Sequence, residues 1–314
     1  MPLSIFCIKT PIEIHANGKL LITGEYLVLV GAKALALPVR FGQILYVEKV
    51  ENKIINWESS STDGTWFTAE FNPETLDVIS TVKPVISSGL KKLLLAARKL
   101  NPEFLTDETG YKVSIHANYP LSWGLGSSST LCYLTAQWAG VDAYDLFRLI
   151  SSGSGYDIAC AGQPDLLYYQ LLERPPIITP TRAGKALREN TYFVYLGKKQ
   201  DSRKEVKAFL TNCNYTDKEV EQVSRLASFI CQAESASELI HLVDEHEAIL
   251  CSILKRKPIV RQFPNFPGTV KSLGAWGGDF AMFVSEESPE TITNILQQNG
   301  FSTVFTFSEI EATK

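Results

Sequence analysis

The stretch YPLSWGLGSSSTLC, residues 119–132, constrains the fold more than any other part of this 314-residue chain. Two glycines in it are followed by three serines and a threonine, and an apolar run begins directly afterwards. Residues 111–117 before it alternate as in a β-strand, and behind it Leu131, Leu134 and Trp138 share one helical face. We therefore expect the stretch to be the loop of a strand–loop–helix arrangement.

A helix start of this kind has two ordinary uses, and the sequence alone leaves both open. In the first, Ser127 caps the helix, because a serine oxygen accepts a hydrogen bond from the free N–H groups of the first turn. In the second, those N–H groups and the helix dipole attract phosphate, and Gly124 and Gly126 let the backbone approach the anion closely. The loop is not a Walker A loop, because no Gly-Lys-Ser/Thr follows the glycines.

A second candidate feature is the segment HANGKLLITGEYLVLVGAKALALPV, residues 15–39. Lys19 directly follows Gly18, and Glu25 stands in a turn a few residues later, so that a cation and an acid can meet near one point. A lysine after glycine is more often an ordinary surface residue, and His15 receives no role. Taken alone, the segment does not establish a site.

Two further glycine turns contain candidate residues. In SSGSGYDIA, Asp157 follows two glycines at an expected helix start, where aspartate is most often a cap. Alternatively, Asp157 is a catalytic base, because a carboxylate beside a lysine can accept a substrate proton while the lysine stabilises the developing negative charge. In SLGAWGGDF, Gly274, Gly277 and Gly278 form either a tight turn before a strand or a set of backbone amides that binds phosphate.

The helical segment LIHLVDEHEAIL contains His241 and His246 beside Asp244 and Glu245, which invites a metal site. The two histidines are five residues apart and so do not share a helical face. We therefore interpret the segment as a solvated helix without a metal.

Composition and charge restrict the class of protein. The chain is 45% hydrophobic and 20% charged, as in globular proteins, and a formal net charge of -4 without a basic block argues against a nucleic-acid partner. No apolar stretch approaches the roughly 18 to 20 residues that span a bilayer, and the N-terminus lacks the pattern of a secretory signal. We therefore expect a cytoplasmic protein with no membrane partner. The cysteines are scattered without zinc or redox spacing, and we expect them to be reduced.

The order of strand and helix patterns predicts an α+β protein. Strand patterns dominate the N-terminal part, apolar residues at helical spacing predict a helix over residues 84–100, and helices and strands alternate later without a regular βαβ rhythm. The proline-rich loop over residues 171–185 favours a domain boundary. We predict an N-terminal domain of residues 1–172 and a C-terminal domain of residues 173–314.

The order of the motifs is more specific than any one of them. Gly-Lys with Gly-Glu-Tyr, then GLGSS, then GSGYD, then GAWGGD, over residues 15–280, resembles the GHMP kinases, the superfamily of galactokinase, homoserine kinase, mevalonate kinase and phosphomevalonate kinase. GKLLITGEY and GSGYD look most like the mevalonate and phosphomevalonate kinase branch. The resemblance implies a two-domain α+β fold with the active site in the cleft between the domains. It also implies transfer of the γ-phosphoryl group of ATP, with magnesium, to a small substrate.

The resemblance further implies roles for individual residues. Asp157 matches the aspartate that acts as catalytic base or orienting group, and Lys19 matches the lysine that neutralises charge beside it. The expected phosphate loop comprises Gly124, Leu125, Gly126, Ser127, Ser128 and Ser129, with Ser128 also expected at the metal. The expected substrate side comprises Glu25, Tyr26, Gly274, Gly277 and Gly278.

This chain departs from the family pattern at several positions. Asn17 stands where the family usually has proline before Gly-Lys, and Trp276 replaces a small residue of the third motif. In mevalonate kinases a glutamate that binds metal precedes the aspartate motif by about three helical turns. The residue here is Leu146, which leaves its neighbour Asp145 as the candidate metal ligand.

The leading hypothesis is therefore an ATP-dependent kinase of mevalonate or phosphomevalonate, in the synthesis of isoprenoid precursors, which works as a monomer or homodimer. The alternatives are a GHMP kinase for another small alcohol such as homoserine or a sugar, a member of the fold that binds a ligand without catalysis, and a diphosphomevalonate decarboxylase. Lys19, Ser128 and Asp157 argue for catalysis, whereas Leu146 and Trp276 argue against it.

Overall fold

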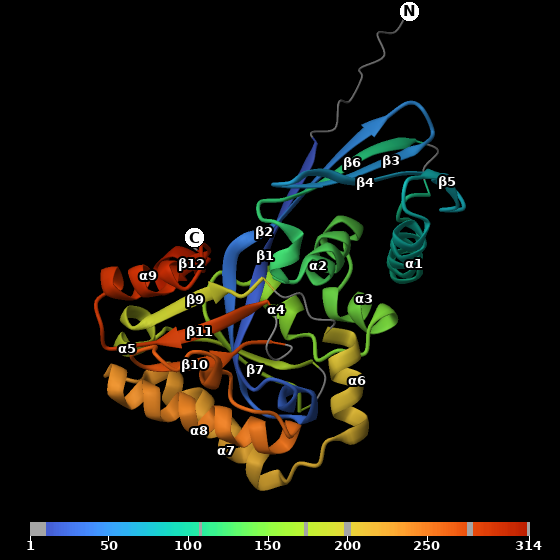
Figure 1. The fold of residues 1–314 in the computed structure, drawn as a ribbon. Helices are drawn as coiled ribbons and strands as arrows, with labels where there is room; N and C mark the ends of the chain where they lie inside the picture. The colour runs from blue at the N-terminus through green and yellow to red at the C-terminus, as the bar shows by residue number, and fades with distance from the viewer. Residues whose placement is uncertain (1–10, 107–108, 173–174, 198–201, 275–278, 313–314) are drawn as a thin grey trace, which may run out of the picture. The chain divides into compact units, whose positions relative to one another are not determined.

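The computed structural model describes residues 11–106, 109–172, 175–197, 202–274 and 279–312 (Figure 1). Two compact units interleave along the chain. Unit 1 comprises residues 1–16, 42–120 and 127–152, and unit 2 comprises residues 17–41, 121–126 and 153–314. The boundary near residue 172, which the proline-rich loop favours, stays a prediction. Two long strands, β1 (Ile12–Thr23) and β2 (Ala34–Val50), each contribute residues to both units.

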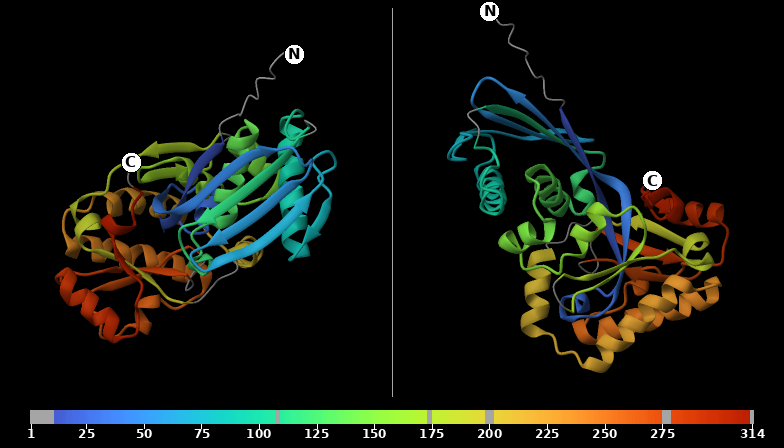
Figure 2. Two further views of the ribbon diagram at one scale, coloured as in Figure 1. Left: turned by 90° about the horizontal axis from the view of Figure 1, so that it is seen from above. Right: turned by 180° about the vertical axis from the view of Figure 1, so that it is seen from behind.

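Unit 1 consists of a sheet with helices on one of its faces (Figure 2). In the sheet, β3 pairs parallel with β6 and antiparallel with β4, β4 pairs with β5, and β6 pairs with the second half of β2. The elements are β3 (Ile55–Ser61), β4 (Gly64–Phe71), β5 (Val78–Thr81), β6 (Gly110–Ala117), α1 (Pro84–Leu100), α2 (Ser127–Ala139) and α3 (Ala143–Ile150). The predicted spacing in α1 is confirmed, since Leu90, Leu93, Leu94 and Ala97 are all buried.

Unit 2 contains the first half of β2 paired with β7 (Leu167–Gln170), which pairs in turn with β8 (Ile177–Pro180). Its second sheet is antiparallel throughout, in the order β10 (Thr269–Ser272), β11 (Phe280–Val284), β9 (Thr191–Tyr195) and β12 (Val304–Thr306). The helices are α4 (Tyr156–Gly162), α5 (Lys185–Glu189), α6 (Ser202–Asn212), α7 (Asp217–Gln232), α8 (Ala236–Leu254), α9 (Pro289–Gln298) and α10 (Phe307–Ile310). Figure 1 shows α7 and α8 side by side, and α8 packs on β10.

The polar run SSSTDG, residues 59–64, belongs partly to β3. Ser59 and Ser61 lie on the buried side of this strand, and the Trp57 indole donates to Ser59 Oγ at 3.0 Å. Ser59 thus accepts the hydrogen bond of a buried indole N–H, a role that the polar composition of the run does not indicate. Among the described residues, no helix is both long and apolar enough to cross a bilayer.

Candidate active site

Lys19 in β1 contacts the predicted phosphate loop through both its backbone and its side chain. Its N–H donates to Leu125 O at 3.1 Å, and its Nζ donates to Gly124 O at 3.1 Å. A Cβ on Gly126 would lie 3.2 Å from Lys19 Cγ, so the loop packs along the lysine. The fold therefore brings together a lysine and a glycine loop that are about a hundred residues apart in sequence.

Glycine is required at two positions around this contact. A Cβ on Gly18 would lie 2.2 Å from Phe41 O, so the strand that carries Lys19 fits only without a side chain there. Gly124 has a φ of 68°, and a Cβ on it would fall 2.0 Å from Asp279 Oδ2. The Asp279 carboxylate thus packs directly against the loop.

The loop continues directly into α2, whose first helical residue is Ser127. Gly126, with a φ of 95°, therefore holds the capping position in place of Ser127, and glycine has no side chain with which to cap. Ser128, in the first turn, is exposed. A glycine loop that leads directly into a helix start suits an anion, because the N-terminus of a helix carries partial positive charge.

Asp157 lies in the first turn of α4, as its sequence pattern predicted. The residue before this helix, Gly155, has a φ of 87°, a conformation that favours glycine. The preceding turn is fixed by the buried Tyr169, whose hydroxyl donates to Ser154 O at 2.5 Å. Asp157 is half-buried, so its carboxylate is held on a defined turn.

Asn17, the residue that replaces the usual proline, links the strand of Lys19 to the helix of Asp157. Its Nδ2 donates to Gln163 O at 2.9 Å, and Gln163 is the residue that ends α4. The departure from the family pattern therefore adds a bond between the two elements that carry the predicted catalytic residues.

Lys19 and Asp157 act electrostatically on the same buried thiol. Burial raises the pKa of Cys160, the charge of Asp157 raises it further, and the charge of Lys19 lowers it. Burial, then the charges of Asp157 and Asp279 among others, keeps the pKa of the Tyr156 phenol well above its ordinary value. The predicted lysine and aspartate thus share one neighbourhood with Asp279, an acid that sequence reasoning missed although it directly follows GAWGG in the sequence.

Glu25 and Tyr26, which were predicted to contact substrate, are both buried. Glu25 forms an ion pair with Lys271 of β10, and neither side chain is exposed. The Tyr26 ring packs on Phe209 with a centroid separation of 5.3 Å. Both side chains thus support the turn from inside unit 2, and their contact with a substrate stays a prediction.

Glu25 belongs to a cluster of four buried ionisable residues in unit 2. The cluster comprises Glu25, His246, Glu247 and Lys271, with exposed fractions of 1%, 0%, 3% and 0%. His246 Nε2 accepts the Gly24 N–H at 3.1 Å and lies 3.8 Å from Glu25 Oε2. The interpretation of this helix as solvated is therefore wrong at His246, because α8 packs that side chain against the turn after β1.

Burial decides the protonation of this cluster. It lowers the pKa of His246 well below the ordinary value, so the imidazole is neutral at neutral pH. It raises the pKa of Glu247 to about 7 and also raises the pKa of Glu25, against the opposing effect of Lys271. The cluster thus contains one cation, two carboxyl groups and one neutral ring.

The remaining predicted residues have varied surroundings. Gly274 follows β10 with a φ of 63°, whereas Gly277, Gly278 and Trp276 lie outside the described residues. Asp145 Oδ1 accepts a bond from Arg148 Nη1 at 2.7 Å, on the exposed side of α3. Where the structure describes the chain, no group of three or more His, Cys, Asp or Glu residues is arranged to hold a metal.

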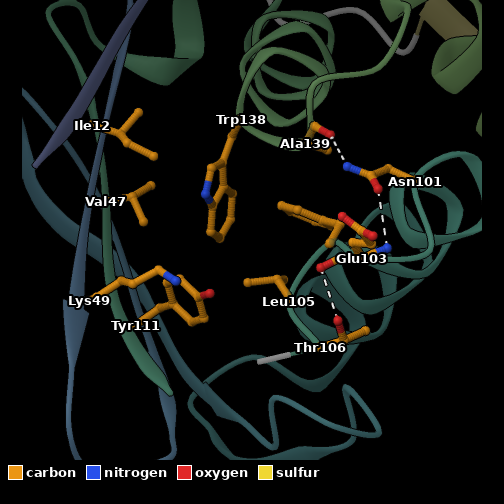
Figure 3. Close-up of a pocket in the computed structure, with 11 residues that line it drawn as sticks. Ile12, Val47, Lys49, Asn101, Glu103, Leu105, Thr106, Tyr111, Trp138 and Ala139 are labelled. Atoms are coloured by element: carbon orange, nitrogen blue, oxygen red, sulfur yellow. Dashed lines mark hydrogen bonds between the residues drawn. The ribbon is translucent and has the colours of Figure 1, made fainter. Parts of the chain in front are cut away.

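A separate hollow of about 730 Å³ lies in unit 1 at the C-terminal end of α2 (Figure 3). Trp138 points into it, facing Val47 of the sheet. Asn101 Nδ2, from the segment after α1, donates to Ala139 O at 2.7 Å and closes one side. No predicted site residue lines this hollow.

Comparison with known proteins identifies the fold. No protein-family model matches the chain, and neither does any curated protein. Methanococcus jannaschii mevalonate kinase matches with a TM-score of 0.67 at 16% identity, covering 98% of this chain and 99% of that one. Streptococcus pneumoniae phosphomevalonate kinase, in complex with phosphomevalonate and AMPPNP, matches with a TM-score of 0.68 at 16% identity, covering 94% and 100%.

Lactococcus lactis galactokinase, complexed with galactose, matches with a TM-score of 0.62 at 13% identity, covering 97% of this chain and 94% of that one. These likenesses extend over nearly the whole of each chain. They confirm the predicted α+β GHMP kinase fold.

Proposed function

We propose that this chain is an ATP-dependent kinase that transfers the γ-phosphoryl group to mevalonate or phosphomevalonate. The observation that carries the proposal is the bond from Lys19 Nζ to Gly124 O, in a neighbourhood shared with Asp157. The likeness in fold to mevalonate and phosphomevalonate kinases supports the class of acceptor. The likeness to a kinase solved with AMPPNP supports ATP as the donor.

In this proposal the glycine loop and the first turn of α2 bind the phosphates of ATP. Phosphoryl transfer depends mainly on positioning and on neutralising charge, so backbone N–H groups at a helix start suit the task. Ser128, exposed in that turn, is the hydroxyl proposed to contact phosphate and metal. Magnesium, when bound, would neutralise charge on the phosphate oxygens.

Lys19 and Asp157 take different roles toward the acceptor. With mevalonate as acceptor, Asp157 accepts the proton of the hydroxyl while the hydroxyl oxygen attacks the γ-phosphorus and the bond from that phosphorus to ADP breaks. With phosphomevalonate as acceptor, Asp157 orients the phosphate of the substrate. Lys19 neutralises charge beside it, and its bond to the loop keeps the cation next to the phosphates. Substitution of a general base typically lowers the rate by about 10² to 10⁴-fold.

A direct test measures ATP consumption by the purified protein with mevalonate, phosphomevalonate, homoserine and galactose as acceptors. We expect one of the first two to stimulate turnover, and Asp157→Asn and Lys19→Met to lower kcat by about 10²-fold or more. His15→Ala, an exposed residue on the same strand as Lys19, is the matched control and should leave turnover unchanged. The proposal fails if no acceptor stimulates turnover, or if Asp157→Asn retains the wild-type rate.

A further inference from the structure

Asp279 places a carboxylate against the glycine loop. Its backbone carbonyl accepts the Leu196 N–H at 2.9 Å, which fixes the residue just before β11. A Cβ on Gly124 would lie 2.0 Å from Asp279 Oδ2 and 2.2 Å from Cγ, so the absence of a side chain at Gly124 makes room for the carboxylate. Lys19 Nζ bonds the carbonyl of the same glycine, so that an acid and a cation flank one loop residue.

A phosphate bound by this loop would therefore meet a negative charge. Charges a few ångströms apart repel strongly in a partly buried site, and Asp279 is only partly exposed. A triphosphate carries several negative charges, of which the single cation of Lys19 offsets only part. The Asp279 carboxylate, held beside the glycine loop, thus weakens the binding of metal-free ATP.

A divalent cation on the phosphates turns the repulsion by the Asp279 carboxylate into an attraction. Mg²⁺ prefers oxygen ligands, and proteins usually hold it through one or two carboxylates together with the phosphates of the substrate. A carboxylate packed on a phosphate loop fits this donor set. Asp279 then attracts the metal–nucleotide complex in place of repelling the nucleotide.

At the two positions considered earlier for this task, one side chain is apolar and the other is bonded to an arginine. Leu146, where mevalonate kinases have a glutamate ligand, is completely buried and apolar. Asp145 accepts a bond from Arg148 on the exposed side of α3. We propose that Asp279 supplies the carboxylate ligand for the divalent cation that accompanies the nucleotide, an inference that rests on the proposed ATP-dependent function.

Binding of AMPPNP, which is not turned over, tests this separately from catalysis. Isothermal titration calorimetry would compare wild type, Asp279→Asn and Asp145→Asn in excess Mg²⁺ and in EDTA. We expect wild type to bind AMPPNP about tenfold more tightly with Mg²⁺, and Asp279→Asn to lose this ratio while binding metal-free AMPPNP more tightly than wild type does. Asp145→Asn, the matched removal of an exposed carboxylate that pairs with Arg148, should keep the wild-type ratio.

Mn²⁺ gives a second readout that needs no change in affinity for the nucleotide. Electron paramagnetic resonance should show Mn²⁺ bound to wild type in the presence of AMPPNP, and this signal should weaken in Asp279→Asn and return in Asp279→Glu. An unchanged Mg²⁺ ratio, or an unchanged Mn²⁺ signal, in folded Asp279→Asn would overturn the assignment and leave the kinase proposal standing. Failure of the wild-type protein to bind AMPPNP with or without metal would overturn both.

Discussion

Replacing Lys271 by methionine should destabilise unit 2 strongly at neutral pH, because the substitution leaves the Glu25 carboxylate buried without its cation. Both side chains of this pair are 0% exposed, so water cannot replace the lost partner. Breaking a buried ion pair from one side typically costs about 3–5 kcal/mol. The lysine also donates to Ser272 O at 2.9 Å, and methionine loses that bond as well.

Protonation of Glu25 sets a limit to this cost. Burial already raises its pKa from the ordinary 4.5, and without Lys271 the carboxyl is expected to be neutral in the folded protein. At pH 7, taking up that proton costs about 3.4 kcal/mol, at about 1.4 kcal/mol for each pH unit above 4.5. We therefore expect Lys271→Met to cost about 3 kcal/mol at pH 7 and progressively less as the pH falls toward 4.5.

The assay is urea denaturation followed by circular dichroism at pH 7 and pH 5, for Lys271→Met and for the double variant Glu25→Gln/Lys271→Met. The double variant should recover most of the lost free energy of unfolding, because it removes the unpaired charge. Lys91→Met, which breaks the exposed pair with Asp77, is the matched control and should have a much smaller effect. A cost below about 1 kcal/mol at pH 7, or a double variant no more stable than the single one, would refute the reasoning.

Three further predictions address single features of the structure. Burial raises the pKa of Glu247 to about 7, so the folded state binds this proton more tightly than the unfolded state does. The stability of the wild type should therefore fall as the pH rises from about 4.5 to 7. Urea denaturation should show that Glu247→Gln gains up to about 3 kcal/mol in unfolding free energy, relative to wild type, between pH 5 and pH 8. Gly124→Ala puts a Cβ 2.0 Å from Asp279 Oδ2 at a φ of 68°, so calorimetry should show AMPPNP affinity falling about tenfold or more, whereas Gly140→Ala, at a φ of 64° with open space around its Cβ, should retain binding. Asn17→Ala removes the hydrogen bond to the end of α4, so we expect a loss of about 1 kcal/mol in unfolding free energy and a lower kcat. Urea denaturation and steady-state kinetics would measure the two effects. An unchanged kcat would show that this bond does not align the catalytic residues.

Regular periodicity and ordered motifs were the parts of the sequence that could be interpreted correctly. The apolar spacing of α1 predicted both the helix and its buried face, because a helix with one apolar stripe has one stable orientation against a sheet. The ordered motifs assigned Lys19 and the loop at Gly124 to one site, and Lys19 Nζ does donate to Gly124 O, a contact that no local property of either segment indicates. That prediction came from the resemblance and not from the chemistry of one segment.

Burial of charge could not be predicted in the same way. His246 and Glu247 lie among charged neighbours on α8. The local sequence around a buried ionisable residue looks the same as that around an exposed one, because the residue that pairs with it comes from another part of the chain. Asp279 was missed for a related reason, since the glycine turn drew attention to backbone amides and away from the acid after it. The pairing of β2 with β6 and β7 likewise could not be predicted, because it joins segments that are far apart in sequence.

The interleaving of the two units has a consequence for the order in which the protein folds during its synthesis. The Glu25 carboxylate and its cation are 246 residues apart, and Gly24 is 222 residues from the imidazole that accepts its N–H. At roughly 5–20 residues per second, a ribosome needs about 12–50 s to make the chain between Glu25 and Lys271. During that interval Glu25, in the turn after β1, has no cation beside it, and the buried cluster of unit 2 cannot be completed until Lys271 emerges. Nascent chains that end before Lys271 should therefore depend most on chaperones, and the C-terminal sheet is the element whose arrival closes the fold.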